Sequence, residues 1–212
     1  MERIRSYFPE LTPGQLGQLE QLAKGLAGWN EKINLVSRKE TSMLEERHLL
    51  HSMAIARFIT FQPGTTIIDV GTGGGLPGLP LAILFPECRF TLVDSIGKKI
   101  RVVSDLVRQT GLTNVTAVQE RAEKLKGPFD FVVSRAVTAF PKFYEWTANL
   151  LKPAAPSSEQ PGGIIYLKGG ELAEELAGFR GRVRIEPIRQ WFSEPFFETK
   201  YVVYLPTGET GT

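Results

Sequence analysis

A glycine-rich turn in the first half of the chain has the residue types of a cofactor site. Residues 67–86, IIDVGTGGGLPGLPLAILFP, read as an apolar strand, a turn crowded with glycine and then a helix. Glycine lacks the Cβ that would block a ligand, and the free N–H groups at a helix N-terminus attract electron-rich groups. We therefore predict that a nucleotide-like or adenosine-bearing cofactor binds at this turn.

The spacing of the glycines separates the classes of cofactor. A phosphate-binding P-loop is excluded, because LPG stands where a lysine followed by serine or threonine would be needed. The dinucleotide pattern G-x-G-x-x-G is matched from Gly73 through Gly75 to Gly78, but the strand ends at Gly71. Counted from Gly71, the sixth position is Leu76, so the dinucleotide match is out of phase with the strand.

Two carboxylates favour S-adenosylmethionine over a dinucleotide. Asp69 lies two positions before Gly71, where it can order the turn through backbone N–H groups or reach the cationic end of a cofactor. An acid there would repel a pyrophosphate. Asp94 ends the next predicted strand, from which it can accept hydrogen bonds from ribose hydroxyls. The alternative role of Asp94 is to cap the following helix.

The elements that position this turn alternate between strands and helices. The early strands are continuous apolar runs, as in a parallel sheet that is covered on both faces. The last two strands lack a helix-length connection, so we expect them to pair antiparallel and to extend the sheet to seven strands. The predicted strands cover residues 65–70, 89–94, 114–119, 129–135, 162–169, 182–188 and 200–206.

A smaller helical region precedes these strands. Thr12, Pro13 and Gln15 read as an N-cap, a first-turn proline and the far end of a capping box. A second helical stretch is predicted over 43–61. The apolar positions of the first helix recur at steps of three and four: Leu16, Leu19, Leu22, Leu26, Trp29 and Ile33. We expect a helical N-terminal extension over 1–62 and a cofactor-binding domain over 63–212.

Composition bounds the setting of the protein. The chain has 212 residues, a net charge of +2 and one cysteine, which is compatible with a nucleic-acid partner and excludes an internal disulfide. No apolar run reaches membrane-spanning length. We expect a cytoplasmic protein that does not enter a membrane and acts as a monomer.

Several motifs together resemble the RsmG/GidB family of bacterial methyltransferases, which modify a guanine N7 in 16S ribosomal RNA. They are DVGTGGGLPGLPLAI, TLVDSIGKKIRVV, RAEKL, FDFVVSRAV, WNEKINLVS and YLKGG. The resemblance implies a Rossmann-like α/β fold of class I methyltransferases: a mostly parallel seven-stranded sheet with an antiparallel last strand and helices on both faces. It also implies S-adenosylmethionine as cofactor and 16S ribosomal RNA or the small ribosomal subunit as partner. A small-molecule methyltransferase is the alternative, and assays with ribosomal RNA would distinguish the two.

The resemblance also implies the residues that contact the cofactor. Asp94 would bind the ribose, Ala122 and Glu123 would line the adenine, and Arg135 would lie beside the methyl donor. Glu123 has the alternative role of a solvated acid at a helix start, and Arg135 that of an ion-pair partner of Glu145 or Asp130. The implied set is Gly71, Gly73, Leu76, Asp94, Ala122, Glu123 and Arg135.

One segment departs from the family pattern. Where the family has His-x-x-Asp-Ser, this chain has HLLHSM, so His51 replaces the acid. His48 and His51 are one helical turn apart, but no third ligand completes a metal site, so we predict packing or capping roles for both and no metal. Asn34 and Lys168 also match the family on the expected substrate side, without an assigned role.

The expected reaction needs no general base. Guanine N7 carries a lone pair and no proton, so it can attack a sulfonium methyl directly and in line. We therefore assign no catalytic residue and expect the rate to come from placement. Two basic clusters near the strand ends are candidates for RNA phosphate contacts, whereas the three tryptophans are predicted to serve in packing. The basic residues are Lys98, Lys99, Arg101, Arg121, Lys124 and Lys126, and the tryptophans are Trp29, Trp146 and Trp191.

Overall fold

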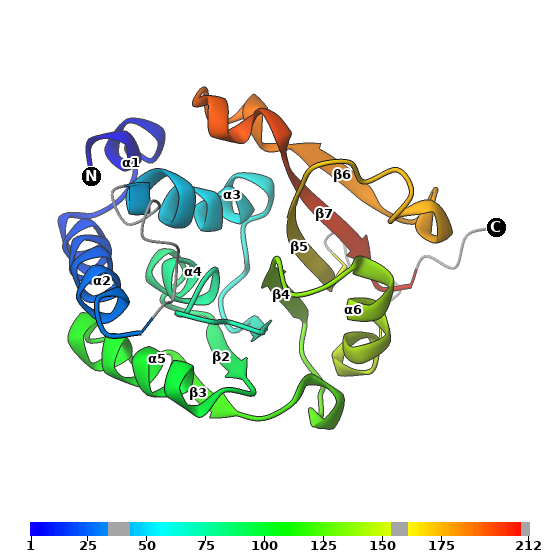
Figure 1. Cartoon of the computed structure of the whole chain (residues 1–212), viewed down its shortest axis with the longest axis horizontal. Coiled ribbons are helices and arrows are strands. Elements are labelled where there is room, and N and C mark those ends of the chain that lie inside the picture. The colour runs from blue at the N-terminus through cyan, green and yellow to red at the C-terminus, as the bar shows by residue number, and fades with distance from the viewer. Residues whose placement is uncertain (34–42, 154–160, 209–212) are drawn as a thin grey trace.

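A twisted seven-stranded sheet runs through the computed structural model, which describes residues 1–33, 43–153 and 161–208 (Figure 1). The strand order is β3-β2-β1-β4-β5-β7-β6, with β1 to β5 parallel and β7 antiparallel to both of its neighbours. This confirms the predicted fold class. The strands are β1 (Thr66–Val70), β2 (Arg89–Asp94), β3 (Val115–Gln119), β4 (Phe131–Arg135), β5 (Gly163–Gly169), β6 (Arg184–Pro187) and β7 (Lys200–Pro206).

The final strand lies inside the sheet rather than at its edge. β7 pairs with β5 and β6 on its two sides, so β6 forms the edge although it comes earlier in the chain. Side-chain chemistry accounts for this order. Val202, Val203 and Leu205 of β7 are buried, whereas Arg184 and Ile185 of β6 are exposed, which suits a short, charged edge strand.

Helices cover both faces of the sheet. Alternate residues of a strand point to opposite sides, so the strands place apolar side chains on both faces. Ile67, Val133 and Ile165 pack with the N-terminal helices, α4 and α5, whereas Ile68 and Val132 pack with α6. Figure 1 shows α2, α4 and α5 on one side and α6 on the other. The helices are α1 (Glu2–Tyr7), α2 (Pro13–Asn30), the π-helix η2 (Leu44–Leu50), α3 (His51–Phe58), α4 (Gly78–Leu84), α5 (Gly97–Thr110) and α6 (Phe140–Thr147).

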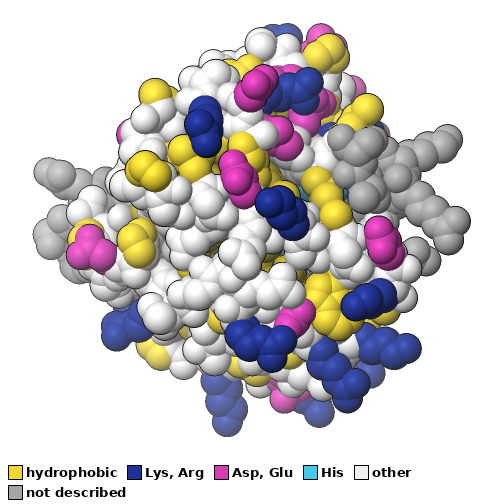
Figure 2. All heavy atoms as spheres, turned by 90° about the vertical axis from the view of Figure 1, so that its left-hand side faces the viewer, with side chains coloured by type: hydrophobic (Ala, Val, Ile, Leu, Met, Phe, Trp, Pro, Cys, Tyr) yellow, Lys and Arg dark blue, Asp and Glu magenta, His cyan; other side chains and the backbone are white. Residues whose placement is uncertain are grey.

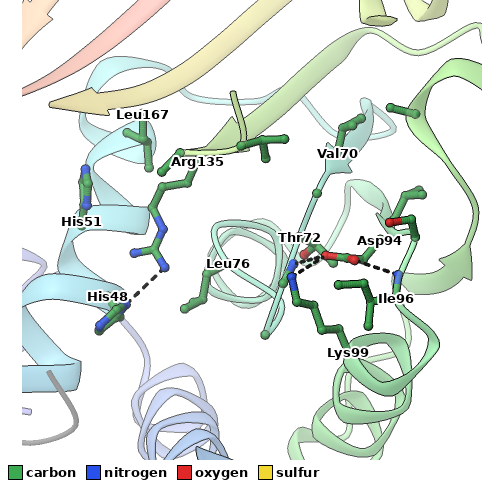
Figure 3. A pocket seen from close by; sticks show the side chains of 18 of the residues that line it. His48, His51, Val70, Thr72, Leu76, Asp94, Ile96, Lys99, Arg135 and Leu167 are labelled. Carbon is green, nitrogen blue, oxygen red and sulfur yellow. Dashed lines mark hydrogen bonds and ion pairs between the residues drawn. The ribbon is translucent and has the colours of Figure 1, made fainter. Parts of the chain in front are cut away.

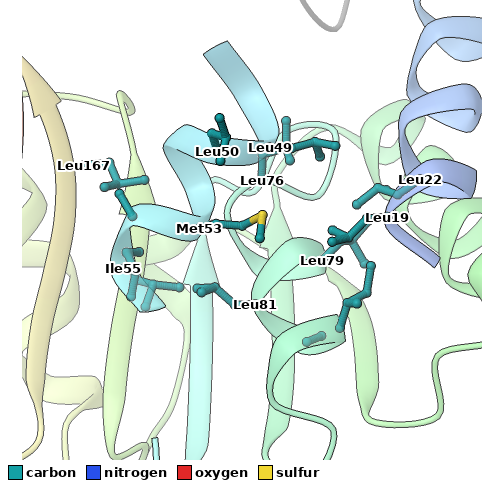
Figure 4. Packing of buried hydrophobic residues seen from close by; sticks show 14 of the residues in the cluster. Leu19, Leu22, Leu49, Leu50, Met53, Ile55, Leu76, Leu79, Leu81 and Leu167 are labelled. Carbon is teal, nitrogen blue, oxygen red and sulfur yellow. The ribbon is translucent and has the colours of Figure 1, made fainter. Parts of the chain in front are cut away.

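The N-terminal helices share one hydrophobic core with the sheet. The predicted capping box is present, since Thr12 accepts from the backbone of Gln15 and the Gln15 side chain accepts in return. Leu19 and Leu22 of α2 and Met53 of α3 belong to the same buried cluster as α4 (Figure 4). The division of the chain at residue 62 stays a prediction. None of the helices in the described ranges is both long and apolar enough to cross a membrane.

The second helical stretch differs from the prediction. Seven of its residues, Leu44–Leu50, form a π-helix, and the helix ends at Phe58 instead of residue 61. A π-helix widens the backbone and is often found at functional sites. Its last turn carries His48 and leads directly into His51. The family-like Asn34 lies outside the described residues.

Candidate active site

The glycine turn after β1 is built from left-handed backbone. Gly71 and Gly73 have φ angles of +73° and +60°, a conformation that side chains with a Cβ rarely adopt. A Cβ on Gly71 would collide with the side chain of Val137, whereas a Cβ on Gly73 would meet nothing within 4 Å. Gly71 therefore allows close packing, and Gly73 leaves its space open to a ligand. This agrees with counting the turn from Gly71 rather than from Gly73.

Asp69 holds the turn from beneath. Its side chain is fully buried, and Oδ2 accepts hydrogen bonds from the Gly78 amide (2.8 Å) and the Thr72 hydroxyl (2.7 Å). Of its two predicted roles, the structure shows the ordering of the turn. Burial raises the pKa of Asp69 to about 7, against the lowering effect of these hydrogen bonds and of Arg135.

Asp94 joins the turn to the next helix. Its Oδ2 accepts from the Gly73 amide (3.1 Å), and its Oδ1 accepts from the Ile96 amide (2.9 Å). Lys99 lies 3.4 Å away and offsets the charge of the carboxylate. Ile96 occupies the N-cap position of α5, so Asp94 orders the backbone just before the helix instead of capping it.

A cavity of about 840 Å³ opens at the carboxyl ends of the central strands. Open α/β sheets bind their ligands at this edge, where the strand order reverses. The structure brings all of the predicted cofactor residues to this one cavity. They are Gly71, Gly73, Leu76, Asp94, Ala122, Glu123 and Arg135. Glu123 is exposed at the rim and Ala122 is half-buried, in a short 3-10 helix of residues Ala122–Lys124.

Arg135 lies on the other side of the cavity from Asp94, and its side chain extends toward His48 (Figure 3). Its guanidinium donates to the Arg47 carbonyl (3.2 Å), and its second terminal nitrogen lies 3.2 Å from His48 Nδ1. Of the two alternative ion-pair partners of Arg135, Asp130 binds Lys152 at 2.8 Å instead, and Glu145 forms no ion pair with Arg135 among the described residues. The π-helix therefore holds the end of Arg135.

The turn after β4 closes the cavity beside Arg135. Ala136 has a φ of +52°, a strained value for a residue with a Cβ. The Tyr166 hydroxyl accepts from the amides of Val137 (2.8 Å) and Thr138 (2.9 Å), which fixes this conformation. Val137 therefore packs against Gly71. No motif in the local sequence predicts this contact.

His48 and His51 are both buried, as expected of packing residues, yet both also line the cavity. The ring of His51 contacts the rings of Phe196 and Phe197 edge-on, with ring centroids 5.5 Å and 6.2 Å apart. Burial lowers the pKa of His51 well below its usual value, and the charges of Arg135 and Lys200 add to this effect. In the part of the chain that the structure describes, no group of three potential ligands is placed to bind a metal.

Sequence reasoning missed part of the cavity wall. Arg47, Phe196 and Lys200 line it although no motif singled them out. Trp146 was predicted to serve in packing, but it is half-buried and also lines the cavity, because α6 buries Phe140, Phe143 and Thr147 and leaves this ring at the margin. The family-like Lys168 lines the cavity and pairs with Glu175 at 2.7 Å.

The predicted RNA-contacting residues lie at the rim and beyond it. Lys99 and Arg121 line the cavity, whereas Lys98 and Arg101 are exposed on α5. Figure 2 shows the face that carries α2 and α5, where Lys and Arg side chains gather in the lower part. The other two tryptophans are half-buried, with Trp29 donating to Asp105 (2.8 Å) and Trp191 packed on the core.

Comparisons with known proteins agree with this architecture. The model of the GidB family, described as rRNA small subunit methyltransferase G, matches residues 15–199. Ribosomal RNA small subunit methyltransferase G of Flavobacterium johnsoniae is 50% identical over 206 residues, covering 97% of this chain and 98% of that protein. The Bacteroides thetaiotaomicron protein of the same name is 49% identical over 204 residues, covering 96% and 98%. A SAM-dependent methyltransferase structure from Aquifex aeolicus, 16% identical, shares the fold with a TM-score of 0.57 over 80% of this chain and 98% of that one.

Proposed function

Because the chain belongs to the rRNA small subunit methyltransferase G family, we propose that it transfers the methyl group of S-adenosylmethionine to N7 of a guanine in 16S ribosomal RNA. The observation that carries the proposal is the convergence of all seven expected cofactor residues on one cavity at the carboxyl ends of the strands. The similarity to these relatives covers nearly the full length of this chain, so it includes the helical N-terminal region.

The cavity has the features that an adenosine cofactor requires. Gly73 leaves open space beside the backbone. The buried carboxylate of Asp94 lines the cavity, where it can accept hydrogen bonds from ribose hydroxyls. Ala122 and Glu123 would lie against the adenine, with Ile96 on the same side. When bound, the cofactor supplies a methyl group on a positively charged sulfur.

The residues of the chain would act by placement rather than by proton transfer. The N7 atom loses no proton when it attacks the methyl group, so the reaction requires no base. Arg135 is held by the π-helix through Arg47 and His48, and Gly71 is fixed by Val137. A rigid pocket of this kind can orient the base toward the methyl group and exclude water, which lowers the entropic part of the barrier.

Transfer of a labelled methyl group to ribosomal RNA tests the proposal. The protein is incubated with methyl-labelled S-adenosylmethionine and either 16S RNA or small subunits from cells that lack the modification. Digestion to nucleosides and mass spectrometry should find the label in 7-methylguanosine. Label in another base would refute the N7 assignment. Label only in small molecules would favour the alternative small-molecule activity. The same assay decides whether naked RNA or the assembled subunit is the substrate.

The remaining parts of the proposal concern the state of the protein. We propose that it works as a monomer in the cytoplasm, where its ribosomal substrate is found. Sedimentation of the pure protein, alone and with RNA, measures the number of chains in the active complex. A dimer that is required for methyl transfer would contradict the monomer.

A further inference from the structure

The two walls of the cavity differ in charge. Its acidic side chains, Asp94, Glu120 and Glu123, all come from the ends of β2 and β3 and the loop after β3, where the cations Lys99 and Arg121 partly offset them. The opposite wall carries four cations. They are Arg47, Arg135, Lys168 and Lys200. The adenosine site proposed above lies along the acidic side, so the cationic side is available for a second, anionic group.

Two of these cations flank one aromatic ring. The guanidinium carbon of Arg47 lies 5.3 Å from the centroid of Phe196, and the ammonium of Lys200 lies 5.0 Å from it. These distances are those of cation–π contacts, which orient a charge without neutralising it. Arg47 belongs to the π-helix and Lys200 begins β7, so the ring brings together charges from distant parts of the chain.

Within the described residues, no carboxylate compensates the charges of this pair. Lys168 is neutralised by Glu175 at 2.7 Å, but Arg47 and Lys200 form no ion pair with a carboxylate of residues 1–33, 43–153 or 161–208. Arg47 Nε is also buried and has no hydrogen-bond partner among these residues. The neighbouring His51 stays neutral at physiological pH, because burial and the charges of Arg135 and Lys200 depress its pKa. A half-buried pair of positive charges in a concave wall concentrates a field that attracts anions.

We propose that Arg47 and Lys200 together bind a backbone phosphate of the RNA, next to the nucleotide whose base enters the cavity. The inference rests on the proposed function. A base that is methylated inside a pocket must leave its stack, and its phosphate must then stay at the wall of the pocket. Phosphate contacts of this kind fix the register of a nucleic acid without reading its sequence. Phe196 is a positioning residue that holds both cations toward the cavity.

The test measures RNA binding of the double variant Arg47→Gln/Lys200→Gln as a function of salt. Loss of one phosphate contact reduces the slope of log K against log salt by about 0.7, which amounts to about fivefold weaker binding at 0.1 M salt. The affinity for S-adenosylmethionine, measured by calorimetry without RNA, should stay within about twofold of the wild-type value. The charge-conserving variant Arg47→Lys/Lys200→Arg should keep the wild-type slope. It also shows whether altered packing alone has an effect.

Arg189→Gln is the matched control, because this cation is exposed and does not line the cavity. It should leave both affinities unchanged. An unchanged salt slope in the double variant would overturn the inference. Weaker cofactor binding with an unchanged slope would assign the two cations to the carboxylate of the cofactor instead. Failure of the wild-type protein to form 7-methylguanosine would refute the proposed function separately, because the slope is measured without turnover.

Discussion

Replacing Asp69 with asparagine tests how the turn is held. The fully buried carboxyl has a pKa of about 7, against an ordinary value of 3.8. Between these values the folded protein keeps a proton on Asp69 that the unfolded chain has released. Stability therefore falls as pH rises through this window, and it becomes constant above about pH 7. At about 1.4 kcal/mol per pH unit, the step from pH 5.5 to pH 8 removes roughly 2 kcal/mol of unfolding free energy.

Asparagine should abolish this pH dependence without breaking the turn. Its side-chain oxygen can accept the bonds from Gly78 and Thr72 that Asp69 Oδ2 accepts. Its amide would take the place of Oδ1, which has no partner among the described atoms. Asp69 does not line the cavity, so the variant should bind S-adenosylmethionine with an affinity close to that of the wild type. The variant therefore distinguishes two roles of the carboxylate: ordering the turn, and contacting the cofactor directly.

Urea unfolding of both proteins at several pH values between 5.5 and 8 measures the effect. The informative quantity is the difference between the two free energies, because other groups titrate equally in both proteins. His51 titrates in the opposite sense, since its lowered pKa makes the folded state less stable below pH 6.5. A difference that stays constant from pH 5.5 to pH 8 would refute the raised pKa. A large loss of cofactor affinity would place the carboxylate in contact with the ligand.

Three further variants and one control test the site and its surroundings. Gly73→Ala should cost about 1–2 kcal/mol because of the left-handed backbone and should weaken S-adenosylmethionine binding in calorimetry, whereas Gly28→Ala, in open space on α2, should stabilise the protein by up to about 1 kcal/mol. His51→Gln should remove the part of the stability loss below pH 6.5 that this ring causes; an unchanged pH profile in urea unfolding would contradict its lowered pKa. The double variant Lys98→Glu/Arg101→Glu should weaken RNA binding and flatten its salt dependence, and an unaltered slope would exclude α5 from the RNA contact.

The residues on the proposed cofactor side of the cavity could be predicted because their sequence signals are local. Gly71 and Gly73 lie in the turn just after β1 and Asp94 is the last residue of β2, and parallel strands bring their carboxyl ends to the same edge of the sheet. Their chemistry is therefore readable from short segments of sequence. The same argument predicted the seven strands, but it did not give the place of β7 between β5 and β6.

Arg135 and Lys168 on the opposite wall were expected from the family resemblance, but the contacts of this wall could not be predicted, because they span the chain. Arg135 donates to the carbonyl of Arg47, 88 positions earlier, and Phe196 meets both His51 and Lys200. None of these pairings leaves a periodic or spaced pattern in the sequence. The π-helix could not be predicted either, since its residues have the composition of an ordinary α-helix.

The two walls differ in what they demand of the sequence. The proposed cofactor wall contains left-handed glycines and a buried acid, which few other residues can replace. The cationic wall requires only positive charge at the right place, and its cations are set by packing from the π-helix, β4, β5 and β7. Since Arg135 ends β4 beside the glycine turn and its guanidinium reaches the π-helix, a change in the π-helix would alter the position of Arg135 relative to the cofactor. The N-terminal helices therefore help to shape the active site as well as to cover the sheet.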